Sequence, residues 1–370
     1  MAPRTTTGTS ITGWGVWHPA DILTNVELCD AFNEFVRRHN AANVGADLKE
    51  SSPEFIWKAS GIERRYVQDK TGLIDPERMC PNIPDRSEDQ LSYQAEYAVN
   101  AAKLALAQAR RAGEDIDLVV LGASNLQRLY PAIAIEVQHA IGARGWAYDI
   151  SLGCSAATGA TIVASQALQA GSATCALVVV PELTTPHMNW RERDSHFIFG
   201  DASVALVIEP IERARPGSWE ILSSQMASKW SNNIRNNAGY TDRCDPATRD
   251  NIDKLFHQHG RRVFKDVVPM AERFVVDHLT QHDLEPSQVA RFWLHQANQS
   301  MNELIMKRVL GRPATRDEAP IILDEFGNTA SAGSLLAFSR HNEDLAAGSY
   351  GIMTSFGAGY SLASLMLRRR

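Results

Sequence analysis

The sequence predicts an α/β fold made of two related halves, with sheets that are covered by helices. Two observations carry this prediction. Continuous apolar runs, which are typical of buried strands, alternate with segments of helical character. Segments of the first half also resemble segments of the second half at a nearly constant spacing. Alternation of strands and helices indicates layered sheets and helices rather than a helical bundle or a β-sandwich.

The elements of the first half follow in order along the chain. The predicted strands are 117–125, 146–153, 176–182 and 202–210. The small-residue segment 155–171 predicts a helix, for which Gly171 is a suitable C-terminal stop. Segments 26–60 and 211–250 are more polar and irregular. We interpret these two segments as insertions near a substrate entrance.

Two matches carry the internal repeat. LVVLGASN (118–125) resembles RFWLHQAN (291–298), which lies 173 positions later. The glycine-bounded turn at 153–159 resembles the turn at 327–333, which lies 174 positions later. Chance recurrence of small-residue turns is the alternative explanation. Agreement between two separate spacings favours a duplication.

The repeat divides the chain into an N-terminal half, 1–210, and a C-terminal half, 211–370. A strand that contains an aspartate is predicted before each turn, with Asp149 in the first half and Asp324 in the second. Two halves related by a pseudo-twofold axis bring equivalent turns together. We therefore expect a site at their junction.

Bulk properties exclude several functions. The chain has 370 residues, of which 44% are hydrophobic and 22% charged, as in ordinary globular enzymes. Its net charge of -6 argues against a nucleic-acid or membrane-surface role, and no run approaches the roughly 18 apolar residues that span a bilayer. The absence of a signal-like start, with five scattered cysteines, predicts a cytoplasmic protein without disulfides or a zinc site.

Cys154 stands at the predicted turn between a strand and a helix, among small residues. Unpaired N–H groups at a helix N-terminus favour a thiolate and can also bind the oxyanion that forms when a thioester is attacked. Taken alone, a cysteine in such a setting is more often a packed core thiol.

His295 and Asn328 gain significance from the repeat. His295 follows an apolar strand, and Asn328 occupies the turn that matches the turn of Cys154. Alone, they read as a surface histidine and a turn or capping residue. A convergent Cys/His/Asn set suits acyl transfer, in which the cysteine is the nucleophile and the other two stabilise a carbonyl oxygen that gains charge.

At these residues the sequence resembles the β-ketoacyl-acyl-carrier-protein synthase III family of thiolase-fold condensing enzymes. The resemblance covers nearly the whole chain. Its motifs are ITGWGVWHP (11–19), SGIERRYV (60–67), the Cys154 turn, HFIFGDASVAL (196–206), LHQAN (294–298), FGNTASAG (326–333) and SFGAGYSLASLMLR (355–368). The longer N-terminal insertion and IPDRSEDQLS (83–92) are similar to long variants that act on medium-chain primers.

The resemblance implies a duplicated thiolase-like fold with five layers, α-β-α-β-α. It implies a homodimer that extends an acyl-CoA primer with malonyl acyl carrier protein in fatty acid biosynthesis, without metal or other cofactor. Cys154 would carry the acyl group, and His295 and Asn328 would stabilise the enolate that remains after loss of carbon dioxide.

The resemblance also implies roles for residues around this set. Phe356 would pack beside the nucleophile, and the backbone of Ala358 would be an oxyanion donor. Tyr130 would reach the acyl pocket of the partner subunit. Lys307 and Arg308 would dock the acidic carrier protein, or would simply belong to a solvated helix face.

Some positions depart from the family pattern. Phe55 and Ala59 replace a tryptophan and an arginine that hold the CoA adenine, and Ser300 replaces a basic residue. The primer could therefore come from a carrier protein, or CoA could bind in another way. Arg64 and Arg65 remain candidate partners for phosphate.

Three other functions compete with this prediction. A related ketosynthase of secondary metabolism, which joins two acyl chains, would share all three residues. A non-catalytic acyl-binding subunit would typically lack the nucleophile. A papain-like hydrolase also uses Cys, His and Asn, but its local sequence cues are missing here.

Overall fold

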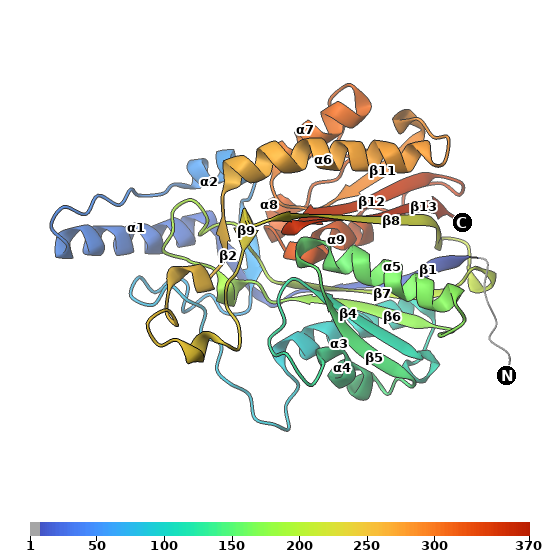
Figure 1. The fold of residues 1–370 in the computed structure, drawn as a ribbon, viewed down its shortest axis with the longest axis horizontal. Helices are drawn as coiled ribbons and strands as arrows, with labels where there is room; N and C mark the ends of the chain where they lie inside the picture. Colours follow the sequence, from blue (N-terminus) through green and yellow to red (C-terminus); the bar gives the residue numbers. More distant parts are fainter. Residues whose placement is uncertain (1–7) are drawn as a thin grey trace.

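The computed structural model describes residues 8–370, and its centre is a nine-stranded sheet (Figure 1). The strands lie in the order β11-β12-β13-β8-β1-β7-β6-β4-β5. Their bounds are β1 Thr9–Trp17, β4 Leu118–Ala123, β5 Trp146–Ser151, β6 Ala176–Glu182, β7 Ala202–Pro210, β8 Trp219–Ser231, β11 Val289–Leu294, β12 Tyr350–Gly357 and β13 Gly359–Arg369. Antiparallel pairing of β1 with β8 joins the strands of the two halves.

The same order of elements occurs twice along the chain. In the first half α3, β4, α4 and α5 precede the antiparallel pair β6 and β7; in the second half α6, β11, α7 and α9 precede the antiparallel pair β12 and β13. The helices are α3 Tyr93–Ala109, α4 Ile133–Ile141, α5 Ala156–Gln169, α6 Gly260–Thr280, α7 Gln299–Leu310 and α9 Gly333–Arg340. The duplicated fold is confirmed, whereas the division at residues 210 and 211 stays a prediction.

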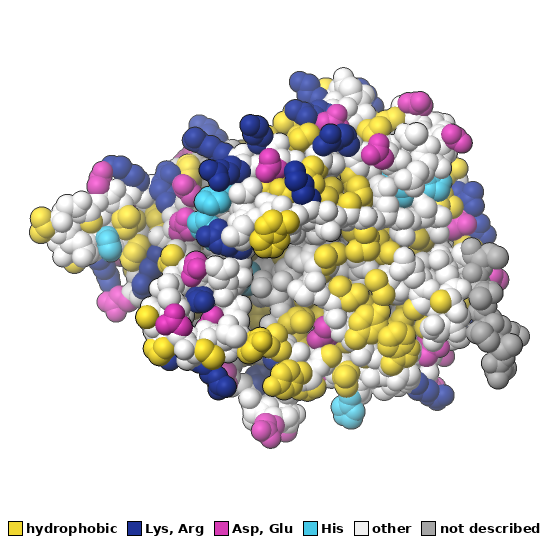
Figure 2. Space-filling view, viewed as in Figure 1, with side chains coloured by type: hydrophobic (Ala, Val, Ile, Leu, Met, Phe, Trp, Pro, Cys, Tyr) yellow, Lys and Arg dark blue, Asp and Glu magenta, His cyan; other side chains and the backbone are white. Residues whose placement is uncertain are grey.

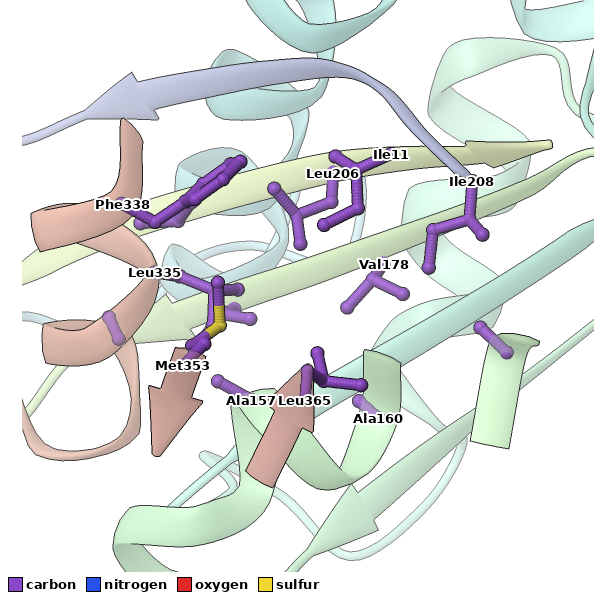
Figure 3. Close-up of a cluster of buried hydrophobic side chains, with 14 of the residues drawn as sticks. Ile11, Ala157, Ala160, Val178, Leu206, Ile208, Leu335, Phe338, Met353 and Leu365 are labelled. Atoms are coloured by element: carbon purple, nitrogen blue, oxygen red, sulfur yellow. The ribbon is translucent and has the colours of Figure 1, made fainter. Parts of the chain in front are cut away.

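The five predicted layers are visible in Figure 1 as α6 and α7, the second-half strands, α5 and α9, the first-half strands, and α3 and α4. The middle layer packs against both parts of the sheet, so most residues of α5 and α9 are buried. Figure 3 shows this core, with Ala157 and Ala160 from α5 and Leu335 and Phe338 from α9. Burial of each large side chain contributes about 1.5–3 kcal/mol, so this layer holds the halves together.

A separate arm extends from one end of the molecule (Figure 1). It consists of the β2–β3 hairpin and two helices: β2 Asp21–Thr24, β3 Arg64–Val67, α1 Asn25–Ala42 and α2 Pro53–Ser60. A second irregular segment, 232–259, contains the short strands β9 Ile234–Arg235 and β10 His257–Gln258. Within residues 8–370, no helix combines the length and the apolar character needed to cross a membrane.

The four predicted strands and the predicted helix all occur, as β4, β5, β6, β7 and α5. The strand predicted around Asp324 is wrong, because Asp324 lies in the short helix α8 Leu323–Phe326. An irregular stretch lies beside β11 instead, where the backbone N–H of Phe292 donates to the carbonyl of Glu318 at 2.7 Å. Pro320 in this stretch has no N–H with which to continue a ladder.

The irregular character predicted for 26–60 and 211–250 is also partly wrong. Most of the first segment is helical, since it contains α1, which begins at a capping box between Thr24 and Glu27, and α2. Much of the second is the 13-residue strand β8, inserted between β1 and β13. One stretch of β8 is exposed to solvent and is therefore rich in polar residues. For this reason the sequence pattern did not predict a strand there.

Candidate active site

Cys154 lies in a short 3-10 turn, Gly153–Ser155, which connects β5 to α5. Gly153 has a φ of +51°, a conformation that glycine adopts without steric cost. The end of β12 approaches this turn closely. A Cβ placed on Gly357 would lie 2.5 Å from the Cβ and 2.9 Å from the Sγ of Cys154, so only glycine leaves room for this cysteine.

Burial of the sulfur opposes the expected preference for a thiolate at this helix N-terminus. Burial raises the pKa of the Cys154 thiol to about 12, and the nearby carboxylate of Glu182 adds to the rise. Hydrogen bonds from the backbone of Ala358 and of Cys154 itself oppose it but do not outweigh burial. Attack on a thioester therefore requires a base to remove the thiol proton.

The same contact places the backbone N–H of Ala358 at the sulfur of Cys154. The backbone N–H of Cys154 itself also faces this sulfur. The predicted role of Ala358 as an oxyanion donor remains a prediction, but its backbone is in position for it.

His295 follows the last residue of β11 and is buried. Its backbone N–H donates to the carbonyl of Thr354 at 2.9 Å, and its carbonyl accepts the side-chain amide of Asn302 at 2.9 Å. The ring stands edge-on to Phe356, with 5.5 Å between centroids. Burial lowers the pKa of His295 to about 4, so the imidazole is neutral at physiological pH and can accept or donate a proton.

Asn328 lies in the matching turn of the second half, directly after Gly327, whose φ is +66°. Its backbone N–H donates to the carbonyl of Ile198 at 2.9 Å, and its carbonyl accepts the N–H of Gly200 at 3.1 Å. The side-chain Oδ1 accepts the N–H of Ala330 at 2.9 Å. The Nδ2 group is thus left to donate to a ligand.

One cavity of about 510 Å³ brings these residues together. Cys154, His295, Asn328 and Phe356 all line it. Much of the remaining wall is apolar and includes Phe55, Ala59, Phe197, Phe256, Val263, Phe264, Val267 and Met301. The elements that supply this wall include α2, α6 and α7, so the arm, which carries α2, helps to form the cavity.

The structure places other predicted residues as follows. Phe55 and Ala59, both on α2, line the cavity, and the guanidinium of Arg193 lies 3.7 Å above the Phe55 ring centroid. Tyr130 does not line it and is 83% exposed. Ser300 lines a second cavity, of about 400 Å³, on the other side of α7.

The predicted basic residues differ in their surroundings. Lys307 lines the second cavity, and Arg308 pairs with Glu272 at 3.1 Å. Arg64 is exposed. The phosphate role suggested for Arg65 is wrong, because this side chain is fully buried and donates to the carbonyls of Leu23 and Phe197 and the side chain of Asn25.

The sequence alone did not indicate two neighbours of Cys154. Gly357 enters the sequence analysis only as part of the motif at 355–368, not as the residue against which Cys154 packs. Glu182 reads as the polar end of an apolar strand, although it is buried beside the site. The repeat offered a signal for both, because they occupy equivalent ends of β6 and β12.

Comparison with known proteins agrees with this geometry. A family model described as 3-Oxoacyl-[acyl-carrier-protein (ACP)] synthase III matches residues 148–229, and the model of its C terminal matches residues 279–369. The β-ketodecanoyl-[acyl-carrier-protein] synthase of Pseudomonas aeruginosa is 48% identical over 348 residues, which cover 92% of this chain and 99% of that protein. A β-ketoacyl-[acyl-carrier-protein] synthase III of Symbiobacterium thermophilum is 30% identical and covers 97% of each chain.

Solved structures show the same fold. A 3-oxoacyl-(acyl carrier protein) synthase III from Pseudomonas aeruginosa matches with a TM-score of 0.78 and 22% identity over 98% of both chains. The priming β-ketosynthase of the R1128 polyketide pathway matches with a TM-score of 0.78 and 24% identity, covering 100% of this chain and 98% of its own. Together with the sequence matches, these findings show that the chain belongs to the 3-oxoacyl-[acyl-carrier-protein] synthase III family of condensing enzymes.

Proposed function

We propose that this enzyme transfers a medium-chain acyl group from CoA to Cys154 and then condenses it with malonyl acyl carrier protein. The observation that carries the proposal is the convergence of Cys154, His295 and Asn328 on one largely apolar cavity. The likeness to a protein named β-ketodecanoyl-[acyl-carrier-protein] synthase supports the primer class.

In the first step, the sulfur of Cys154 attacks the thioester carbonyl of the primer. The thiol proton passes to the neutral imidazole of His295, and the N–H groups of Ala358 and Cys154 hold the oxyanion. The carbon–sulfur bond to CoA then breaks, and the proton on His295 returns to the departing thiolate. The products are acyl-Cys154 and free CoA.

In the second step, the malonyl thioester places its carbonyl oxygen at His295 and the Nδ2 group of Asn328. Loss of carbon dioxide leaves the bonding electron pair in an enolate, which these two donors stabilise. The enolate carbon attacks the acyl carbonyl on Cys154, the carbon–sulfur bond breaks, and the thiolate takes up a proton. The product is a β-ketoacyl carrier protein, two carbons longer than the primer.

We also propose a homodimer that forms through β5. This strand is at the edge of the sheet, and its first residue, Trp146, is 46% exposed. Figure 2 shows hydrophobic side chains gathered on the face where Figure 1 places α5 and β5. Pairing of two β5 edges would cover this face and bring Tyr130 toward the partner's acyl pocket.

The remaining partner assignments follow from charge. The exposed Lys307 and Arg308 at the end of α7 would meet the acidic carrier protein. We place the reaction in the cytoplasm, where CoA thioesters are available.

Intact-mass measurement tests the function directly. Incubation with decanoyl-CoA or octanoyl-CoA is expected to add one acyl mass to the enzyme, and malonyl carrier protein is expected to discharge it as a β-ketoacyl product. Cys154→Ala should take up no acyl group, whereas Cys175→Ala, which changes a buried thiol elsewhere, should do so normally. The absence of an acyl adduct with every saturated primer from two to twelve carbons would refute the proposal.

A further inference from the structure

Glu182, the last residue of β6, is a buried carboxylate beside the nucleophile, with 1% of its surface exposed. Its four hydrogen bonds come from two serines. Oε1 accepts the N–H of Ser124 at 2.9 Å, the N–H of Ser331 at 3.0 Å and the hydroxyl of Ser331, and Oε2 accepts the hydroxyl of Ser124 at 2.7 Å. Burial of a carboxylate held only by neutral groups is costly, which suggests a function for it.

The bonds of Glu182 connect the two halves of the chain. Ser124 directly follows β4 in the first half. Ser331 lies in the 3-10 turn Ala330–Ala332, whose first N–H holds Oδ1 of Asn328. The carboxylate therefore links the turn Ala330–Ala332 to the end of β4. This is the turn that fixes the side-chain amide of Asn328.

The pseudo-symmetry of the two halves relates Glu182 to the residue that packs against Cys154. Ala176 pairs with Leu118 in the first half, and Gly351 pairs with Arg291 in the second. Ala176 and Gly351 are therefore equivalent positions. Glu182 and Gly357 lie equally far along their strands from these positions, so they are equivalent as well. The β12 position supports the turn of Cys154 by leaving room for it, whereas the β6 position supports the turn of Asn328 by binding it.

We propose that Glu182 is a positioning residue for condensation, which holds the turn of Asn328 so that its Nδ2 group faces the enolate oxygen. This inference rests on the function proposed above. Acylation of Cys154 depends on the N–H groups at the other turn, so loss of Glu182 separates the two half-reactions. The negative charge of Glu182 also raises the pKa of the Cys154 thiol, so loss of Glu182 should change the pH dependence of thiol reactivity as well.

The test uses Glu182→Ala, Glu182→Gln and the matched control Glu209→Gln. Glu209 is also a buried glutamate near the end of a strand, but it bonds to Thr12 and Arg111 and does not line the cavity. Glu182→Ala is expected to lower the condensation rate by about 100-fold, the effect of losing one oxyanion donor, while primer acylation does not fall. Glu182→Gln, which keeps an acceptor for Ser331, should recover part of the rate.

The pH dependence of Cys154 alkylation by iodoacetamide gives a readout that does not require condensation. Both Glu182 variants should shift its midpoint to lower pH, because a negative charge near the thiol has been removed; Glu209→Gln should leave it unchanged. An unchanged midpoint, or equal losses in acylation and condensation, would overturn the inference. Failure of the wild type to release carbon dioxide from the malonyl thioester would instead count against the proposed function.

Discussion

Gly357 and Cys154 are packed so closely that a side chain on the first would displace the second. Gly357→Ala is therefore expected to reduce primer acylation by about 100-fold, because a shift of about 1 Å at a reacting group has effects of this size. The rate of acyl-adduct formation, followed by intact mass, measures the loss.

Gly239→Ala is the matched control for this change, since a Cβ there meets no atom within 4 Å. The control should acylate at the wild-type rate. Normal acylation of Gly357→Ala would mean that the turn of Cys154 adapts without cost, and that its close packing is not required for attack.

Cys154 and His295 are both uncharged at rest. Cys154 rests as a thiol and His295 as a neutral imidazole, because burial disfavours the charged form of each. Neither group is activated before substrate arrives. In the proposed mechanism, reaction therefore requires transfer of a proton between them when a thioester occupies the cavity.

At the scale of elements, α2 is the helix that joins the arm to the catalytic cavity. It ends at Gly61, whose φ is +81° and whose added Cβ would lie 2.3 Å from Oε1 and 2.8 Å from Cβ of Gln299 at the start of α7. Gly142 ends α4 with a φ of +70° but has open space around it. Substitution of Gly142 therefore tests backbone strain alone, whereas substitution of Gly61 tests backbone strain together with a steric clash.

Gly61→Ala and Gly142→Ala should each lose about 1 kcal/mol in the free energy of unfolding from the left-handed backbone. Gly61→Ala is expected to lose about 1–3 kcal/mol more through the clash with α7, and to raise the KM for the primer. Urea denaturation and steady-state kinetics measure the two effects. Equal destabilisation of both variants would show that α2 moves freely against α7.

Elements also show what the sequence could predict. Strands β4 to β7 and the helix after Cys154 were predictable because their apolar runs are continuous and bounded by small or polar residues. The strand β8 was not, because its polar residues follow from an exposed segment of sheet. The helix α8 replaced a predicted strand because Asp324 matches Asp149 by position alone, while Pro320 and the loop beside β11 differ.

The meeting of Cys154 and Asn328 at one cavity was predictable from the repeat, which is a property of the whole chain. Equivalent turns of two similar halves meet at their junction, so Cys154 and Asn328 could be placed together before any coordinates. Glu182 could not be placed in this way. A carboxylate at the end of a strand normally faces water, and only the packing of the two halves buries it.

At the scale of the whole molecule, buried histidines connect stability to pH. Burial lowers the pKa of His187, His278 and His295 to about 4 and that of His196 to about 3. Each folded-state pKa lies below the ordinary value near 6.5, so the unfolded chain takes up protons first as the pH falls. Their contribution to stability is complete above pH 6.5 and is lost progressively toward pH 4.

Four such histidines lower the free energy of unfolding by about 5 kcal/mol between pH 7 and pH 5.5, because a bound proton is worth about 1.4 kcal/mol per pH unit and the unfolded imidazoles are only partly protonated near pH 7. Burial raises the pKa of Glu182 and Asp201, which opposes the loss at the acidic end of this range. Urea denaturation at several pH values measures how steeply the free energy of unfolding changes with pH. His278→Asn should make this dependence less steep, by the contribution of one histidine. A flat profile between pH 7 and pH 5.5 would mean that these imidazoles titrate normally in the folded enzyme, and His295 would then be partly charged when it has to accept the thiol proton.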